Sequence, residues 1–162
     1  MKFGVQVSCY RTTWDDINAS IQTLEAGRWN SLWFADHFLP PSPGSPGGAR
    51  EQEQGTAFEG YTLIAVAAGM TKKLRLGHLV LGNTYRNPAL LAKMATTLDQ
   101  ASKGRFVLSL GAAWFAREHE AFGWDFPSLK ERSDRFEEAC ELIRKLFTAE
   151  GPVDYDGQSY QL

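Results

Sequence analysis

Several signatures of specialised proteins are missing from this chain of 162 residues. No GxGxxG or GxxxxGK(S/T) loop follows a predicted strand, so the usual dinucleotide and nucleoside triphosphate sites are unsupported. The 17 basic and 19 acidic residues include no long basic run, and we therefore expect no nucleic-acid partner. Lys72, Lys73 and Arg75 break the longest apolar stretch, which speaks against a membrane span. Because the N-terminus also lacks a secretion signal, we expect a cytoplasmic protein.

Cysteine and histidine are scarce as well. Cys9 and Cys140 lie in apolar patterns without a neighbouring cysteine or histidine at metal-ligand spacing, so we expect two buried reduced thiols and no metal site. His78 falls within a predicted strand, where we expect a core histidine with satisfied hydrogen bonds. His119 lies in a charged helical segment and is expected to face solvent. His37 is therefore the remaining histidine that we consider as a candidate for acid-base chemistry.

The rest of the composition, with 43% hydrophobic and 22% charged residues, is typical of one ordinary globular domain over residues 1–162. Apolar patterns predict strands at residues 2–8, 31–35, 74–81 and 105–110. Helices are predicted after the N-caps Thr13, Asn87 and Ser128, and over residues 61–70. A β-α unit repeated four times favours an α/β fold with a parallel sheet, either open or part of a barrel.

Two segments interrupt this alternation. Residues 40–56 form a loop rich in proline and glycine, which is typical of a binding loop, an active-site lid or an untethered excursion. Asp156 and Gly157 lie between two short apolar segments, and they predict the turn of a C-terminal β-hairpin over residues 153–162.

Small and polar residues follow the predicted strands, where parallel α/β folds bind their ligands. Asp36 and His37 follow the second strand, Gly82 follows the third, and Ala112 and Ala113 follow the fourth. His37 can exchange protons near neutral pH, with Asp36 as a hydrogen-bonding partner. In the alternative interpretation Asp36 caps a turn and His37 is merely packed, because an isolated Asp-His pair is a weak motif.

Three stretches resemble the luciferase-like monooxygenase superfamily, and together they run through almost the whole chain. They are SLWFADHF at 31–38, LGHLVLGNTYRNPALLAKMATTLDQASKGRFVLSLGAAW at 76–114, and residues 118–162. The Asp-His-Phe sequence at 36–38 resembles the branch that uses the deazaflavin coenzyme F420. The branch that uses flavin mononucleotide (FMN) tends to have a glutamate and paired histidines there.

The resemblance implies a TIM-barrel type of fold, of which this chain would form the N-terminal (β/α)4 half. In such a barrel a deazaflavin ring stands at the carboxyl ends of the strands and exchanges hydride with a small organic substrate. His37 would be the catalytic acid, and a non-proline cis peptide would join Leu79 to Val80 against the ring. The implied cofactor-binding residues are Asp36, Leu79, Val80, Gly82, Ala112, Ala113 and Arg117.

Two departures from the family pattern concern the substrate and the coenzyme. Pro41 and Trp114 occupy positions where the F420-dependent sugar-phosphate dehydrogenases have a tryptophan and an acidic general base, so we do not expect glucose 6-phosphate as substrate. The usual GAGW turn reads GAAW, and the extra methyl group of Ala113 is expected to weaken coenzyme binding.

The third departure is the length of the chain. The family continues with four more β-α units, which carry a Gly-Gly segment that holds the coenzyme phosphate. Four parallel strands leave two open edges that a stable protein must pair or cover. A second copy, a separate C-terminal half, or a rearranged hairpin and loop would each do so, and a portion of a longer enzyme is equally compatible. The resemblance also implies a homodimer.

These observations predict an F420-dependent oxidoreductase of the luciferase-like class, or a portion of one. Two alternatives stay open. One is an FMN-dependent monooxygenase of the same superfamily, and the other is a catalytically silent half-barrel for flavin binding or assembly. The visible spectrum of the purified protein separates them, because F420 and oxidised flavin absorb differently and an empty half-site is colourless.

Overall fold

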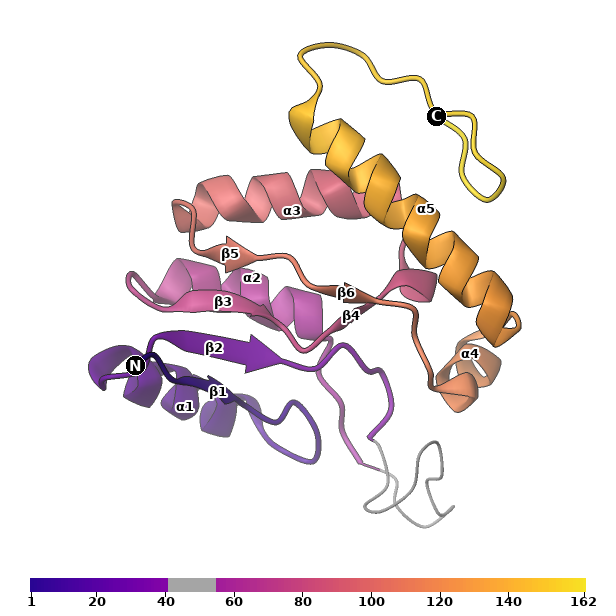
Figure 1. The fold of residues 1–162 in the computed structure, drawn as a ribbon. Helices are drawn as coiled ribbons and strands as arrows, with labels where there is room; N and C mark the ends of the chain where they lie inside the picture. The colour runs from indigo at the N-terminus through magenta and orange to yellow at the C-terminus, as the bar shows by residue number, and fades with distance from the viewer. Residues whose placement is uncertain (41–54) are drawn as a thin grey trace.

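The computed structural model describes residues 1–40 and 55–162, so most of the predicted loop at 40–56 lies outside the described residues. Strands form a layer with helices packed against it (Figure 1). In the described ranges, no helix combines the length and apolar character that a membrane span requires.

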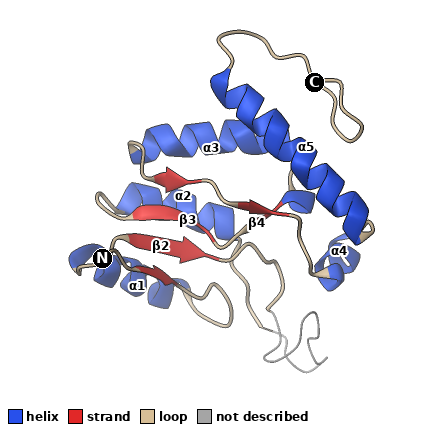
Figure 2. Cartoon of the chain, in the orientation of Figure 1, coloured by secondary structure: helices blue, strands red, loops and turns tan. Residues whose placement is uncertain are grey.

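Four strands form one parallel sheet in the order β1-β2-β3-β5. Their bounds are β1 Gly4–Gln6, β2 Ser31–Phe34, β3 Arg75–His78 and β5 Phe106–Val107. A second, two-stranded parallel sheet pairs β4 (Leu81–Gly82) with β6 (Leu110–Gly111). Strands and helices alternate along the chain (Figure 2), which confirms the predicted α/β fold with a parallel sheet.

Two predicted strands are each divided in the structure, which corrects the single strands expected at 74–81 and 105–110. β3 ends at His78 and β4 begins at Leu81, while β5 ends at Val107 and β6 begins at Leu110. The two interruptions face each other, because the Ser109 hydroxyl donates to the carbonyl of His78 and the Leu81 amide donates to the carbonyl of Ser109 at 3.0 Å. The apolar pattern continues through both interruptions, so it did not indicate them.

Local capping signals begin three helices where the sequence predicted. Thr13 and Asp16 form a reciprocal capping box, in which the Asp16 amide donates to the Thr13 hydroxyl at 3.2 Å. The side-chain Oδ1 of Asn87 accepts from the Ala89 amide at 2.9 Å, ahead of a proline in the first turn. Ser128 accepts from the Glu131 amide. The helices are α1 Trp14–Ala26, α2 Gly60–Met70, α3 Pro88–Ser102, α4 Ala116–Phe122 and α5 Leu129–Thr148, with a 3-10 turn η1 at Asn83–Tyr85.

The hydrophobic core lies between the four-stranded sheet and its helices. Alternate strand residues such as Leu32 and Phe34 are fully buried, whereas Trp33 on the opposite face is only partly covered. Trp33 lies over the backbone of β3, and a Cβ atom at Gly77 would approach its ring to 2.5 Å. Further core residues come from the helices and strands, including Ile17, Ile21, Ile64, Leu76, Leu91 and Ile143.

Two expectations about packing are only partly right. Cys9 is fully buried as predicted, but Cys140 is exposed. On α5 the sequence pattern predicts an apolar side made of Phe136, Ala139, Cys140, Ile143 and Phe147. Ala139 and Ile143 are buried as predicted, whereas Cys140 and Phe147 are exposed. α5 packs against α3 (Figure 1).

The C-terminal segment pairs with itself, but the turn lies two residues later than predicted. Tyr155 and Leu162 exchange two backbone hydrogen bonds, and the Gly157 amide donates to the carbonyl of Tyr160 at 3.0 Å. The predicted turn at Asp156 and Gly157 is therefore wrong, and the chain turns between 157 and 160. A contact with α5 explains this register, because the Glu138 carboxylate accepts from the amides of Ser159 and Tyr160.

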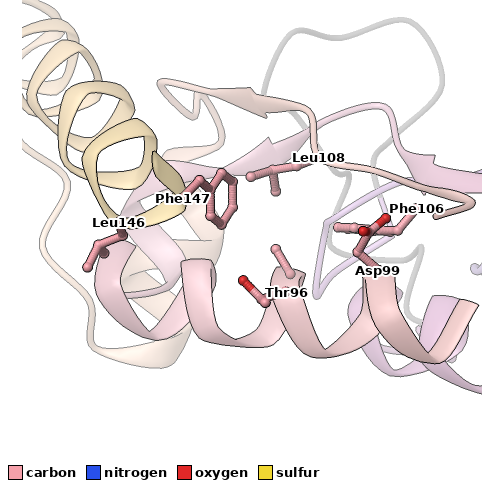
Figure 3. Close-up of a pocket in the computed structure, with 7 residues that line it drawn as sticks. Thr96, Asp99, Phe106, Leu108, Leu146 and Phe147 are labelled. Atoms are coloured by element: carbon pink, nitrogen blue, oxygen red, sulfur yellow. The ribbon is translucent and has the colours of Figure 1, made fainter. Parts of the chain in front are cut away.

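The outer strands β1 and β5 end the four-stranded sheet. A cavity of about 380 Å³, lined by apolar side chains together with Thr96 and Asp99, lies beside β5, between α3 and the C-terminal part of α5 (Figure 3). Phe106 and Leu108 contribute to it from the strand side, and Leu146 and Phe147 from α5. Within the described residues, this edge of the sheet thus presents apolar side chains next to a strand that is paired on one side only.

Candidate functional site

A cavity of about 290 Å³ opens at the carboxyl ends of the strands. Every site residue predicted from the sequence lines it except Arg117, which lies on α4. Four lining residues were not among the predicted set, namely Leu81, Tyr85, Gly111 and Trp114. The complete lining is Asp36, His37, Leu79, Val80, Leu81, Gly82, Tyr85, Gly111, Ala112, Ala113 and Trp114.

One wall of the cavity is apolar and partly open to solvent. The peptide bond between Leu79 and Val80 is cis, as the resemblance implied, and these two side chains are 50% and 46% exposed. Gly111 faces this wall, since a Cβ atom there would come within 2.9 Å of a Val80 methyl group. Ala113 has a left-handed backbone with a φ of 63°, a conformation that favours glycine.

Asp36 is buried at the end of β2 and is held by three hydrogen bonds. Arg86 donates to both of its carboxylate oxygens, at 2.7 and 2.8 Å, and the Gly82 amide donates at 2.8 Å. Arg86 also donates to Glu59, the N-cap of α2, at 2.6 Å. Burial opposes the charge of Arg86, but Asp36 and Glu59 outweigh it and raise the pKa of the guanidinium. The charge of Asp36 is therefore matched within the protein.

His37 is the cavity residue suited to proton transfer. Its side chain is 18% exposed, and its Nδ1 lies 2.9 Å from a carboxylate oxygen of Glu118. The rings of Trp114 and Phe115 meet it edge-on, with centroid distances of 5.3 and 5.7 Å. No hydrogen bond to Nε2 occurs within residues 1–40 and 55–162, so this nitrogen remains for a ligand.

Glu118 is a candidate site residue that the sequence pattern did not indicate. Its side chain on α4 is fully buried, and its carboxylate meets His37 and the Tyr85 hydroxyl as well as two backbone amides. Burial raises the pKa of this carboxyl group, but the hydrogen bonds from His37 and Tyr85 outweigh burial and lower it. His37 and Glu118 are 81 positions apart, so no local pattern could have paired them.

The other two histidines need correction. His119 is fully buried, not solvated: its Nδ1 donates to the Phe115 carbonyl at 2.9 Å and its Nε2 lies 2.7 Å from the Thr84 hydroxyl. His78 is a core residue as expected, but neither ring nitrogen has a hydrogen-bond partner among the described residues. It stacks on Tyr61 at 5.4 Å, and burial lowers its pKa.

Comparisons with known proteins agree with this geometry. A family model described as luciferase-like monooxygenase matches residues 1–162. An F420-dependent glucose-6-phosphate dehydrogenase of Amycolatopsis mediterranei is 32% identical over 149 residues, which cover 91% of this chain and 41% of the relative. The corresponding enzyme of Segniliparus rotundus is 36% identical over 162 residues, which cover 99% of this chain and 45% of the relative.

A solved F420-dependent secondary alcohol dehydrogenase, in complex with an F420-acetone adduct, has a similar fold. It superposes with a TM-score of 0.82 at 24% identity, covering 99% of this chain and 46% of that one. The chain thus spans less than half the length of the relatives it matches. These matches confirm the expected architecture, the N-terminal half of a luciferase-like barrel.

Proposed function

Because the chain belongs to the luciferase-like monooxygenase family, we propose that it forms the ring-binding half-site of an F420-dependent oxidoreductase. The observation that carries this proposal is the cavity itself, in which an open apolar wall lies beside a histidine held by a buried carboxylate. Relatives at 32% and 36% identity are F420-dependent enzymes, which supports F420 over FMN. An FMN-dependent monooxygenase is the alternative.

The cavity residues fit a flat, largely uncharged ring. Leu79 and Val80 present apolar surface to the cavity, and Gly111, Ala112 and Ala113 have side chains small enough to leave backbone accessible beside it. Asp36, the carboxylate in the cavity lining, is already paired with Arg86. When bound there, F420 supplies a deazaflavin that accepts or donates a hydride. Leu79, Val80, Gly82, Ala112 and Ala113 would hold it, and the predicted direct contact from Asp36 stays part of the proposal.

His37 would exchange the proton that accompanies hydride transfer. Oxidation of an alcohol releases one hydride and one proton, and reduction of a carbonyl group consumes them. Nε2 of His37 would take or give that proton, since Nδ1 is engaged by Glu118. An imidazole nitrogen can both accept and donate a proton, so one side chain can serve both directions.

A small uncharged substrate fits the cavity better than glucose 6-phosphate does. No lysine or arginine lines the cavity among the described residues, so a phosphate group would find no cationic partner there. Trp114 is 47% exposed where the sugar-phosphate enzymes are expected to carry an acidic residue, and its ring meets His37. We therefore propose an alcohol or carbonyl compound without charge.

The site would be completed by a second half-barrel. β1 and β5 end the sheet, and the cavity beside β5 is placed to accept a further strand and helix (Figure 3). A second copy of this chain or a C-terminal half would supply them. Light scattering distinguishes the two, because a completed four-plus-four barrel has twice the mass of this chain and a complementing half adds mass only when it is present.

Fluorescence titration with F420 and with FMN tests the proposed function. We expect saturable binding with preference for F420, weakened at least tenfold by Val80→Asn because an amide replaces apolar surface. Leu129→Asn is the matched control, since Leu129 is 68% exposed and lies on α5 outside the cavity. His37→Ala should leave F420 binding intact and abolish turnover of any substrate found. Preference for FMN would favour the monooxygenase, and no binding of either by the folded protein would indicate a silent half-barrel.

A further inference from the structure

The buried carboxylate of Glu118 collects four hydrogen bonds from three segments of the chain. One oxygen accepts from the backbone amides of Phe38 and Leu39, at 2.6 and 2.9 Å. The other accepts from the Tyr85 hydroxyl at 2.5 Å and lies 2.9 Å from Nδ1 of His37. We propose that Glu118 is a positioning residue, which holds the proton of neutral His37 on Nδ1 and leaves Nε2 unprotonated for the cavity.

The first step of the argument concerns the charge of Glu118. A fully buried carboxyl group is normally easier to protonate, because burial disfavours its charged form. Here the amides of Phe38 and Leu39 and the Tyr85 hydroxyl already donate to its two oxygens, and three such hydrogen bonds favour the ionised form. The donors outweigh burial and lower the pKa of Glu118, so the group is an anion at neutral pH.

The second step concerns the proton of His37. An ionised carboxylate can only accept, so the 2.9 Å contact requires a hydrogen atom on Nδ1. A neutral imidazole carries one N–H, and Nε2 is therefore the nitrogen with the free lone pair. In this tautomer His37 accepts a proton from a ligand at Nε2, and in its protonated form it donates one from the same atom.

The third step concerns the orientation of the ring. The amides of Phe38 and Leu39 directly follow His37, so the same carboxylate fixes both the ring and the backbone beside it. Trp114 and Phe115 contact the ring edge-on. A rotation that exchanged the two nitrogens would leave the buried anion without one of its donors, which is costly in a dry environment.

Other titratable groups around His37 do not replace Glu118 in this role. Asp36 precedes it in the chain, but Arg86 and the Gly82 amide occupy the Asp36 carboxylate. The Tyr85 hydroxyl donates to Glu118, and burial together with Glu118 raises the pKa of Tyr85, so it stays protonated. The carboxylate of Glu118 is thus the anion that sets the tautomer.

Two-bond ¹H–¹⁵N correlation spectra of the intact chain test the proposal directly, because they distinguish the two neutral tautomers. The chain has three histidines, and loss of one set of signals in His37→Gln assigns the relevant ring. At the high-pH end of the titration we expect His37 with a protonated Nδ1 and a bare Nε2. The opposite tautomer, or a mixture, would overturn the proposal without any further variant.

Glu118→Gln adds a second, sharper readout. The side-chain oxygen of the glutamine can still accept the hydrogen bonds from the amides of Phe38 and Leu39. The glutamine NH2 group then points toward His37 and donates to Nδ1, which favours a proton on Nε2 instead. We expect the tautomer to reverse in this variant and to stay unchanged in Glu120→Gln, an exposed position on the same helix. An unchanged tautomer in folded Glu118→Gln would refute the positioning role.

The functional value of this arrangement rests on the proposed function, but its test does not. If F420 fails to bind the intact chain while the Nδ1–H tautomer is found, the proposed function fails and the positioning role of Glu118 stands. If F420 binds and the neutral ring carries its proton on Nε2, the proposed function stands and the positioning role of Glu118 fails.

Discussion

Replacing Ala113 by glycine should stabilise the protein, whereas the same change at the neighbouring Ala112 should destabilise it. Ala113 has a φ of 63°, and Ala112 is not among the residues with positive φ. Both positions line the cavity and both lose one methyl group, so the pair isolates the effect of backbone conformation. The prediction therefore depends on the backbone at the turn after β6.

The magnitude follows from two opposing contributions. A left-handed conformation costs a residue with a Cβ atom roughly 1–2 kcal/mol, and glycine removes that cost. Glycine also has more conformational freedom in the unfolded chain, and this lowers the stability of the folded protein by about 0.4–1 kcal/mol. The net effect of Ala113→Gly is a stabilisation of about 0.5–1 kcal/mol. Ala112→Gly relieves no left-handed strain, so only the destabilising gain of freedom in the unfolded chain remains.

Chemical denaturation of both variants beside the unmodified protein measures the difference. We expect the urea midpoint to rise for Ala113→Gly and to fall for Ala112→Gly with an unchanged m-value. The corresponding melting temperatures should separate by about 2–5 °C for a chain of this size. Equal losses of stability in the two variants would refute the left-handed assignment of Ala113 and the reasoning built on it.

Two further predictions concern the stability of the scaffold. Arg105→Met should lower the free energy of unfolding in urea by about 3 kcal/mol, because Arg105 donates five hydrogen bonds, including ones to the carbonyls of Ala68, Leu74 and Ser102. Arg144→Met is the control, and it should change this free energy little because Arg144 lies on the exposed side of α5. Stability should decline as the pH falls below about 6.5, since burial lowers the pKa of His78 and the unfolded chain binds the proton more readily. His78→Phe should flatten this decline in denaturation curves taken between about pH 7 and pH 5, and an unaltered slope would contradict the assignment.

Local interactions could be predicted from the sequence because neighbouring residues make them. The capping box of Thr13 and Asp16 and the Asn87-Pro88 helix start each involve side chains three positions apart or fewer. The apolar pattern likewise determined the order of strands and helices, and the parallel sheet followed from that order. The residues after each strand pointed to the cavity, since parallel strands bring their carboxyl ends to one edge.

Tertiary structure decided the features that depend on distant partners. The interruption of the third and fourth predicted strands, the turn held by Glu138 and the burial of His119 all arise from contacts between separate elements. The contact between His37 and Glu118 likewise joins the segment after β2 to α4. A local sequence pattern predicts that a charged residue is exposed to solvent. Only the packing shows that hydrogen-bond donors from elsewhere in the chain outweigh the cost of burying its charge.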